Sequence, residues 1–117
     1  MKKQISWFED ILENIARIER FTANCDLEKL DEDEQTFFAV LHALLIISES
    51  ARRLGAAAET LAPGPPWRAI RDLGNILRHA YDDVNPHAIR WIVRNDLGNL
   101  KLAVEQALKD RPPETKP

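Results

Sequence analysis

Polar side chains that could bind or cleave a phosphodiester are concentrated between positions 71 and 82 of this 117-residue sequence. Their spacing of i, i+4, i+7, i+8 and i+11 would place them on one face of a helix, in the order Arg71, Asn75, Arg78, His79 and Asp82. Arginine can clamp phosphate oxygens with its planar guanidinium group, and histidine can transfer a proton near neutral pH. The same spacing also fits an ordinary solvated helix face, stabilised by a pair between His79 and Asp83 or between Arg78 and Asp82.

The other chemistry-bearing residues form no recognisable site. His42 lies in an apolar stretch, which indicates a histidine of the core or of an interface, and the apolar flanks of Glu49 fit either a buried or interfacial acid or a partly exposed one. The three histidines lack metal-ligand spacing and Cys25 is the one cysteine, so we expect no metal site, no cofactor and no intrachain disulfide. The three tryptophans are predicted to anchor the core: Trp7, Trp67 and Trp91.

The composition is that of one small globular domain. Hydrophobic residues make up 44% and charged residues 30% of the sequence, and the net charge of −3 disfavours a general binder of duplex DNA. No apolar run approaches the roughly 18 residues of a membrane-spanning helix. Glu9 and Asp10 follow the N-terminus too closely for a signal peptide. We therefore expect a cytoplasmic protein without a membrane segment.

The charge is distributed unevenly along the chain. Residues 1–34 contain 5 basic and 10 acidic side chains, whereas residues 67–94 contain 5 basic and 3 acidic ones together with His79 and His87. A local basic surface within an acidic protein can attract a phosphate-bearing partner. The alternative is that these charges are spread over solvated helix faces.

The hydrophobic periodicity predicts helices throughout and no strand. The predicted elements are a helix over 4–24, a short extra turn near 26–31, a central apolar helix over 32–60, a third helix that opens at Trp67 after Pro63-Gly64-Pro65-Pro66, and a fourth from an Asn85 cap to about residue 110. Asp31 and Glu34 have the spacing of a capping box for the central helix. The expected fold is an all-α, up-and-down four-helix bundle over 1–110, with 111–117 as a flexible tail.

Three of the four glycines fall inside the predicted helical segments, and two of them bear on helix packing. Gly55, followed by three alanines, is predicted to allow close approach of two helices. Gly74 costs its helix about 1 kcal/mol relative to alanine, so its presence asks for a reason such as close packing against another helix. A symmetric dimer that crosses at Gly74 would supply such packing.

The stretch from Gly74 to Tyr81, Gly-Asn-Ile-Leu-Arg-His-Ala-Tyr, resembles the signature of the HepT-like proteins, which belong to the HEPN superfamily of helical ribonuclease domains. The family's motif is Arg, then Asn, three further residues, His, one residue and Tyr. Asn75, His79 and Tyr81 match it in register. The resemblance extends along nearly the whole chain, through the opening helix, Trp67, the stretch 46–51 (usually Ile-Ile-Gly-Glu-Ala in the family) and the closing helix over 89–108.

This resemblance implies a homodimer in which the two motif helices meet and build a composite site for RNA cleavage. Cleavage in the family is metal-independent, with attack of the ribose 2′-OH on the adjacent phosphate, so His79 would be the acid–base residue and Asn75 a positioning residue. The resemblance also implies a toxin, neutralised by a minimal nucleotidyltransferase antitoxin that transfers AMP to the motif tyrosine, here Tyr81.

The sequence departs from the family's pattern at one position, because Gly74 stands where the motif has arginine. Arg78 lies one turn later and Arg71 nearly one turn earlier, and either could present a guanidinium group to phosphate. Three functions therefore stay open: an endoribonuclease, a catalytically degenerate HEPN binding module that pairs with a nucleotidyltransferase, and a structural helical adaptor.

Overall fold

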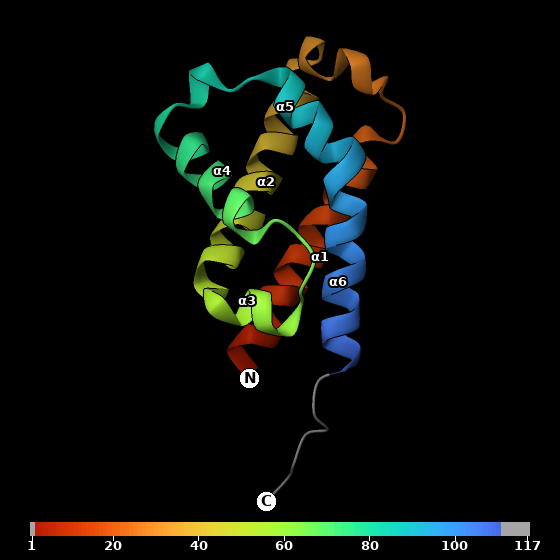
Figure 1. The fold of residues 1–117 in the computed structure, drawn as a ribbon. Coiled ribbons are helices and arrows are strands. Elements are labelled where there is room, and N and C mark those ends of the chain that lie inside the picture. The colour runs from red at the N-terminus through yellow and green to blue at the C-terminus, as the bar shows by residue number, and fades with distance from the viewer. Residues whose placement is uncertain (1, 111–117) are drawn as a thin grey trace, which may run out of the picture.

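The computed structural model describes residues 2–110, and within that range the chain is helical with no β-strand (Figure 1). In chain order the elements are α1 (Lys2–Thr22), the 3₁₀ helix η1 (Leu27–Glu32), α2 (Glu34–Leu54), α3 (Ala56–Leu61), α4 (Trp67–His79), the 3₁₀ helix η2 (Tyr81–Asp83), α5 (Pro86–Trp91), the π-helical segment η3 (Ile92–Asp96) and α6 (Leu97–Lys109). The expected all-α fold is confirmed, and so is the extra turn, as η1. The predicted tail, 111–117, lies outside the described residues.

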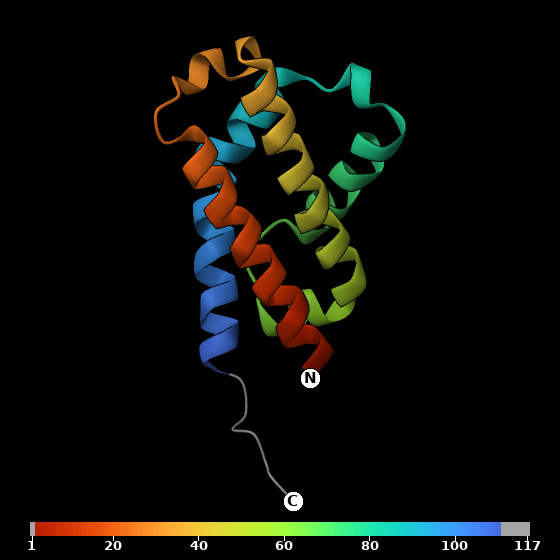
Figure 2. The same ribbon diagram turned by 180° about the vertical axis from the view of Figure 1, so that it is seen from behind.

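The central helix of the bundle is α2. It packs against α1 and against α4, and α1 also packs against α6 (Figures 1 and 2). Because α2 has neighbours on two sides, most of its circumference is apolar, as expected for a helix buried on more than one face. Its buried apolar residues are Val40, Leu41, Ala43, Leu44, Ile47, Ala51 and Leu54.

The three tryptophans lie in different environments. Trp67 is buried at the start of α4, where its indole N–H donates a hydrogen bond of 2.8 Å to the carbonyl oxygen of Ala62. Trp7 is partly buried against the core, but Trp91 exposes 62% of its surface. His42 is exposed on α2. The prediction of a core anchor is therefore wrong for Trp91, and His42 is not a core residue.

The predicted single helix over 32–60 is divided in two at Gly55. This residue has a φ of 56°, which glycine tolerates best, and its N–H caps α2 by bonding to the carbonyl oxygens of Ala51 and Arg52 at 3.2 Å. A Cβ at Gly55 would meet nothing within 4 Å, so this glycine ends a helix and does not serve a close approach. At the other end of α2 the N-cap is Asp33, whose carboxylate accepts from the N–H of Thr36. The predicted capping box of Asp31 and Glu34 is therefore wrong, because the cap lies two residues later than Asp31.

The fourth predicted helix begins as expected but changes geometry along its length. The side chain of Asn85 caps α5 by accepting from the N–H of His87 at 2.9 Å, with Pro86 in the first turn. The π-helical segment η3 then interrupts the helix before α6, which ends at Lys109. The interruption lies beside the groove between α4 and α6, where Ile92 and Asp96 contribute to the wall.

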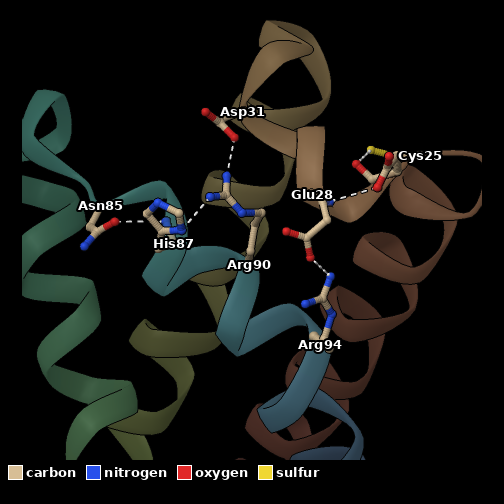
Figure 3. A network of polar contacts seen from close by, with 8 residues as sticks. Cys25, Glu28, Asp31, Asn85, His87, Arg90 and Arg94 are labelled. Atoms are coloured by element: carbon tan, nitrogen blue, oxygen red, sulfur yellow. Dashed lines mark hydrogen bonds and ion pairs between the residues drawn. The ribbon is translucent and has the colours of Figure 1, made fainter.

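Ion pairs join the beginning of this fourth helical stretch to the acidic connection between α1 and α2 (Figure 3). Arg90 binds Asp31, and Arg94 binds Glu28. The Nδ1 atom of His87 lies 2.7 Å from a guanidinium nitrogen of Arg90. Two arginines of the basic segment 67–94 therefore lie beside two carboxylates of the acidic segment 1–34 in the fold, and the charges of each pair neutralise each other.

Candidate active site

The candidate residues depend on the length of α4. The helix starts directly after the proline-rich stretch and ends at His79, where the N–H of Ala80 bonds to the carbonyl oxygen of Ile76 at 2.8 Å. Asp82 follows in η2, beyond the end of the helix. The predicted continuous face is therefore correct as far as His79 and wrong at Asp82.

Gly74 packs tightly against α2 of the same chain. A Cβ at this position would lie 2.4 Å from the Oγ and 2.8 Å from the Cβ of Ser48, which is closer than real Cβ contacts allow. The hydroxyl of Ser48 donates a hydrogen bond of 2.7 Å to the carbonyl oxygen of Ile70, one turn before Gly74. The expected close helix packing is confirmed, and it lies within the chain, so Gly74 is no evidence for a dimer crossing at this point.

The guanidinium group of Arg78 lies over Gly74. Its Nη1 atom is 3.4 Å from the point where a Cβ of residue 74 would be, and this nitrogen donates to the carboxylate of Glu49 on α2. The other carboxylate oxygen of Glu49 accepts from Arg52 at 2.9 Å. Arg78 pairs with Glu49 in place of the local Asp82 partner that helical spacing suggested.

Arg71 is bound in a different way, one that uses most of its donors. Nε donates to the carbonyl oxygen of Ala51 at 3.2 Å, Nη2 donates to that of Gly55 at 2.7 Å, and both terminal nitrogens bind the carboxylate of Glu59. The hydrogen bonds from Arg71 lower the pKa of Glu59, and the same hydrogen bonds raise the pKa of Arg71. These contacts fasten α4 to the end of α2 and to α3.

Asn75 and His79 are exposed. Neither side chain has a hydrogen bond to another side chain that the structure describes. Together with Arg78 they occupy consecutive turns at the C-terminal half of α4, and Tyr81 begins the next element two residues later. An amide, an imidazole and a guanidinium group thus lie along one short stretch of helix. These groups can bind a phosphate, orient it and transfer a proton to or from a bound hydroxyl.

The basic segment is less basic in the fold than in the sequence. Four of its five arginines bind carboxylates from other elements: Arg71, Arg78, Arg90 and Arg94. The fifth, Arg68, is in none of the described ion pairs. The sequence indicated the arginines but not these partners. The α2 residues Ser48, Glu49 and Arg52 were missed as neighbours of the site, although the spacing of Glu49 and Arg52 is that of a helical ion pair.

A family model described as Ribonuclease HepT-like matches residues 11–107 of this sequence. The chain belongs to the HepT-like ribonuclease family. A protein of Thermococcus cleftensis named "Probable ribonuclease HepT" is 35% identical over 103 residues, which are 88% of this chain and 94% of that protein. A protein of Methanocaldococcus jannaschii named "Putative RNase MJ1380" is 31% identical over 96 residues, which are 82% of this chain and 88% of that protein. No solved structure is significantly similar.

Membership of the HepT-like family confirms the resemblance drawn from the motif on α4. It fits a helical domain of the HEPN kind. No helix among residues 2–110 is both long enough and apolar enough to cross a membrane. Within the same residues, no group of three or more histidine, cysteine or acidic side chains is arranged to hold a metal ion.

Proposed function

We propose that this HepT-like chain is an endoribonuclease, the toxin of a toxin–antitoxin pair, in which His79 is the acid–base residue, Asn75 positions the substrate and Arg78 binds the scissile phosphate. The observation that carries the proposal is the placement of the Arg78 guanidinium group over Gly74, beside the turn that bears His79. The motif arginine is absent from the sequence, but a guanidinium group is present next to the position of its Cβ.

The choice of Arg78 over Arg71 rests on free donors. Arginine has five N–H donors. The hydrogen bonds of Arg71 use four of them, two on backbone carbonyl groups, whereas Arg78 gives one to Glu49. Arg78 keeps donors for a phosphate, and Arg71 would have to break its contacts with α2 and α3 first.

The proposed reaction needs a base, an acid and a cation. His79 takes the proton from the ribose 2′-OH, the 2′-oxygen forms a bond to phosphorus, and the bond from phosphorus to the 5′-oxygen breaks. A protonated imidazole returns a proton to the leaving oxygen, which gives a 2′,3′-cyclic phosphate and a 5′-OH. In a homodimer the two copies of His79 can share the two proton transfers, and Arg78 stabilises the charge on the phosphate.

The dimer and the antitoxin belong to the same proposal. The resemblance to the family supports a homodimer through α4, in which Ile76, 47% exposed on this helix, would be available for contact with the partner. The resemblance to the family supports a minimal nucleotidyltransferase as partner, with Tyr81 as the residue that receives AMP, and a site of action in the cytoplasm.

RNA cleavage by purified protein tests the enzyme. Wild type, His79→Ala and Arg68→Ala are incubated with a labelled single-stranded RNA in the presence of a chelator, and products are separated by size. We expect cleavage by wild type, a loss of about a hundredfold or more in His79→Ala, and wild-type cleavage in Arg68→Ala, which changes an exposed arginine at the far end of α4. Equal cleavage by wild type and His79→Ala would overturn the assignment.

A second candidate function is a binding module that has lost catalysis, which Gly74 at the arginine position favours. Co-expression with a minimal nucleotidyltransferase, the proposed antitoxin, separates the two. A catalytic toxin slows growth when expressed alone and gains the mass of AMP when co-expressed, unless Tyr81 is changed to Phe. A degenerate module forms the same complex but affects neither growth nor RNA when expressed alone.

A further inference from the structure

Glu49 lies between two arginines from two helices. One carboxylate oxygen accepts from Arg78 on α4, and the other accepts from Arg52, one turn further along α2, at 2.9 Å. The side chains are 27% exposed for Glu49, 31% for Arg78 and 60% for Arg52, so a ligand can reach all three. The group lies at the C-terminal half of α2, opposite the half of α4 that carries His79.

The net charge of this group suits the binding of one anion. Two guanidinium groups and one carboxylate sum to a single positive charge, which matches the single negative charge of a phosphodiester. Each arginine gives one donor to Glu49, so most of the donors on both guanidinium groups are available. The carboxylate between them reduces their mutual repulsion and restricts their rotamers before any ligand arrives.

The backbone next to this group is held in place on both helices. Ser48, which precedes Glu49, bonds to the carbonyl oxygen of Ile70, and this contact fixes the register of α2 against α4. Gly74 provides the space into which Arg78 folds back toward Glu49. The two arginines therefore extend from helices whose backbones are packed against each other and fixed in register.

We propose that Glu49 is a positioning residue that holds Arg52 and Arg78 as a two-arginine clamp for one backbone phosphate of single-stranded RNA. This inference rests on the proposed function, and it adds Arg52 and Glu49 of α2 to the residues that act on the substrate. The strand then crosses from α4 onto α2, with one phosphate between the two guanidinium groups.

A different role for Glu49 predicts the opposite result. If its carboxylate only competed with phosphate for the two arginines, removing its charge would strengthen RNA binding. If it positions them, Glu49→Gln weakens binding although the protein becomes more positive, because the two guanidinium groups repel each other and lose their fixed orientation. The sign of the change therefore separates the two roles.

Binding is measured with a fluorescent, 2′-O-methylated single-stranded RNA oligonucleotide, which cannot undergo attack by the 2′-oxygen, at one fixed salt concentration. Arg52→Ala is expected to raise the Kd about tenfold, the effect of one charge-assisted hydrogen-bonding group. The matched control is Arg53→Ala, since Arg53 is the next residue on the same exposed turn, points about 100° away around the helix and has no ion pair among the described residues. We expect a change below about twofold in that control.

Glu49→Gln is expected to raise the Kd by about the same tenfold factor as Arg52→Ala. Equal Kd values for Arg52→Ala and Arg53→Ala, unchanged or tighter binding in Glu49→Gln, or no binding by wild type would each overturn the clamp. Thermal unfolding of each variant shows whether it is folded, and the contrast between Arg52→Ala and Arg53→Ala decides the matter if Glu49→Gln does not fold.

Cleavage kinetics separate the clamp from the proposed function. Arg52→Ala is expected to raise KM with kcat unchanged, whereas Glu49→Gln, which also releases Arg78, lowers kcat as well. If Glu49 had only a structural role, Glu49→Gln would change the stability of the protein without this difference between the effects of the two variants on KM and kcat. If wild type binds the methylated RNA with the expected contrasts but cleaves no RNA, the clamp stands and the ribonuclease proposal fails. If wild type cleaves RNA without those contrasts, the clamp alone fails.

Discussion

The two halves of α4 each carry an arginine on the side that faces α2, and the two arginines have different partners. Arg71 and Arg78 are seven residues apart, almost two helical turns, so they point in nearly the same direction. Arg71 binds two backbone carbonyl groups and the carboxylate of Glu59, whereas Arg78 binds one oxygen of Glu49. One helix face therefore holds a structural arginine at one end and an available arginine at the other.

The difference follows from which part of α2 each arginine meets. Arg71 meets the last turn of α2 and the glycine that ends it, where the carbonyl oxygens of Ala51 and Gly55 accept from its guanidinium group as well as from the N–H groups of Gly55 and Ala58. Arg78 lies beside the previous turn, where its described hydrogen bond goes to the carboxylate of Glu49 and to no backbone carbonyl group. Arg71 thus contacts the end of α2 and Arg78 contacts a side chain further back along α2, and this difference separates the roles of the two arginines.

Arg78→Ala tests the available arginine and has the largest expected effect. Removing an electrostatic stabiliser of the transition state typically costs about a hundredfold to a thousandfold in rate, so kcat/KM for RNA cleavage is expected to fall by that factor. The free energy of unfolding is expected to change by less than about 1 kcal/mol, because Arg78 has one partly exposed partner. Cleavage assays and urea unfolding on the same preparations measure both quantities, and wild-type kinetics in this variant would remove Arg78 from the site.

Arg71→Ala tests the structural arginine and should give the converse result. Loss of the bonds to two backbone carbonyl groups is expected to lower the free energy of unfolding by about 2 kcal/mol. Cleavage by the protein that remains folded should be unchanged, which is checked well below the unfolding midpoint. A large loss of kcat with normal stability would mean that the assignment of the two arginines is reversed.

The sequence predicted the local features of this fold better than the contacts between helices. Prolines 63, 65 and 66 mark a break, and Asn85 marks a cap, because a missing N–H or a short polar side chain acts within a few residues. The break at Gly55 was missed, since the alanines that follow favour a helix and the positive φ depends on how α2 ends.

The candidate site divides in the same way. Asn75, Arg78 and His79 could be predicted from helical spacing and from the motif. The pairing of Arg78 with Glu49 could not, because the two residues are 29 positions apart and spacing along one helix predicts only neighbours on that helix. For the same reason Gly74 could be recognised as unusual in a helix, but not as the partner of Ser48.

A double-mutant cycle on Ser48 and Gly74 tests the packing of α4 against α2 at the point between Arg71 and Arg78. Gly74→Ala gains about 1 kcal/mol of helix propensity and loses about 2 kcal/mol to overpacking against Ser48, so it should be destabilised by about 1 kcal/mol. In the Ser48→Gly background the clash is absent, and the same substitution should stabilise the protein by about 1 kcal/mol. Urea unfolding of the four proteins would give a coupling of about 2 kcal/mol, and additive effects would contradict the close contact.

Acid unfolding gives the smallest expected effect and tests the Arg71 end alone. The pKa of Glu59 is lowered in the folded protein, mainly by the hydrogen bonds from Arg71, from an ordinary value of 4.5. The unfolded chain therefore binds a proton at higher pH than the folded chain, and the stabilisation by Glu59 is complete above about pH 5 and is lost as the pH falls through the lowered value. Between about pH 5 and pH 3, Glu59→Gln should lose less stability than wild type.

The control for this titration is Glu9→Gln, which removes an exposed carboxylate of α1 and should keep the wild-type slope. A residual slope is expected in Glu59→Gln, because hydrogen bonds from Thr36 also lower the pKa of Asp33 at the start of α2. In Arg71→Ala the slope should match that of Glu59→Gln, since the same hydrogen bonds are absent. A wild-type slope in Arg71→Ala would mean that Glu59 is stabilised by something other than this arginine, and the contrast between the two ends of α4 would lose its electrostatic basis.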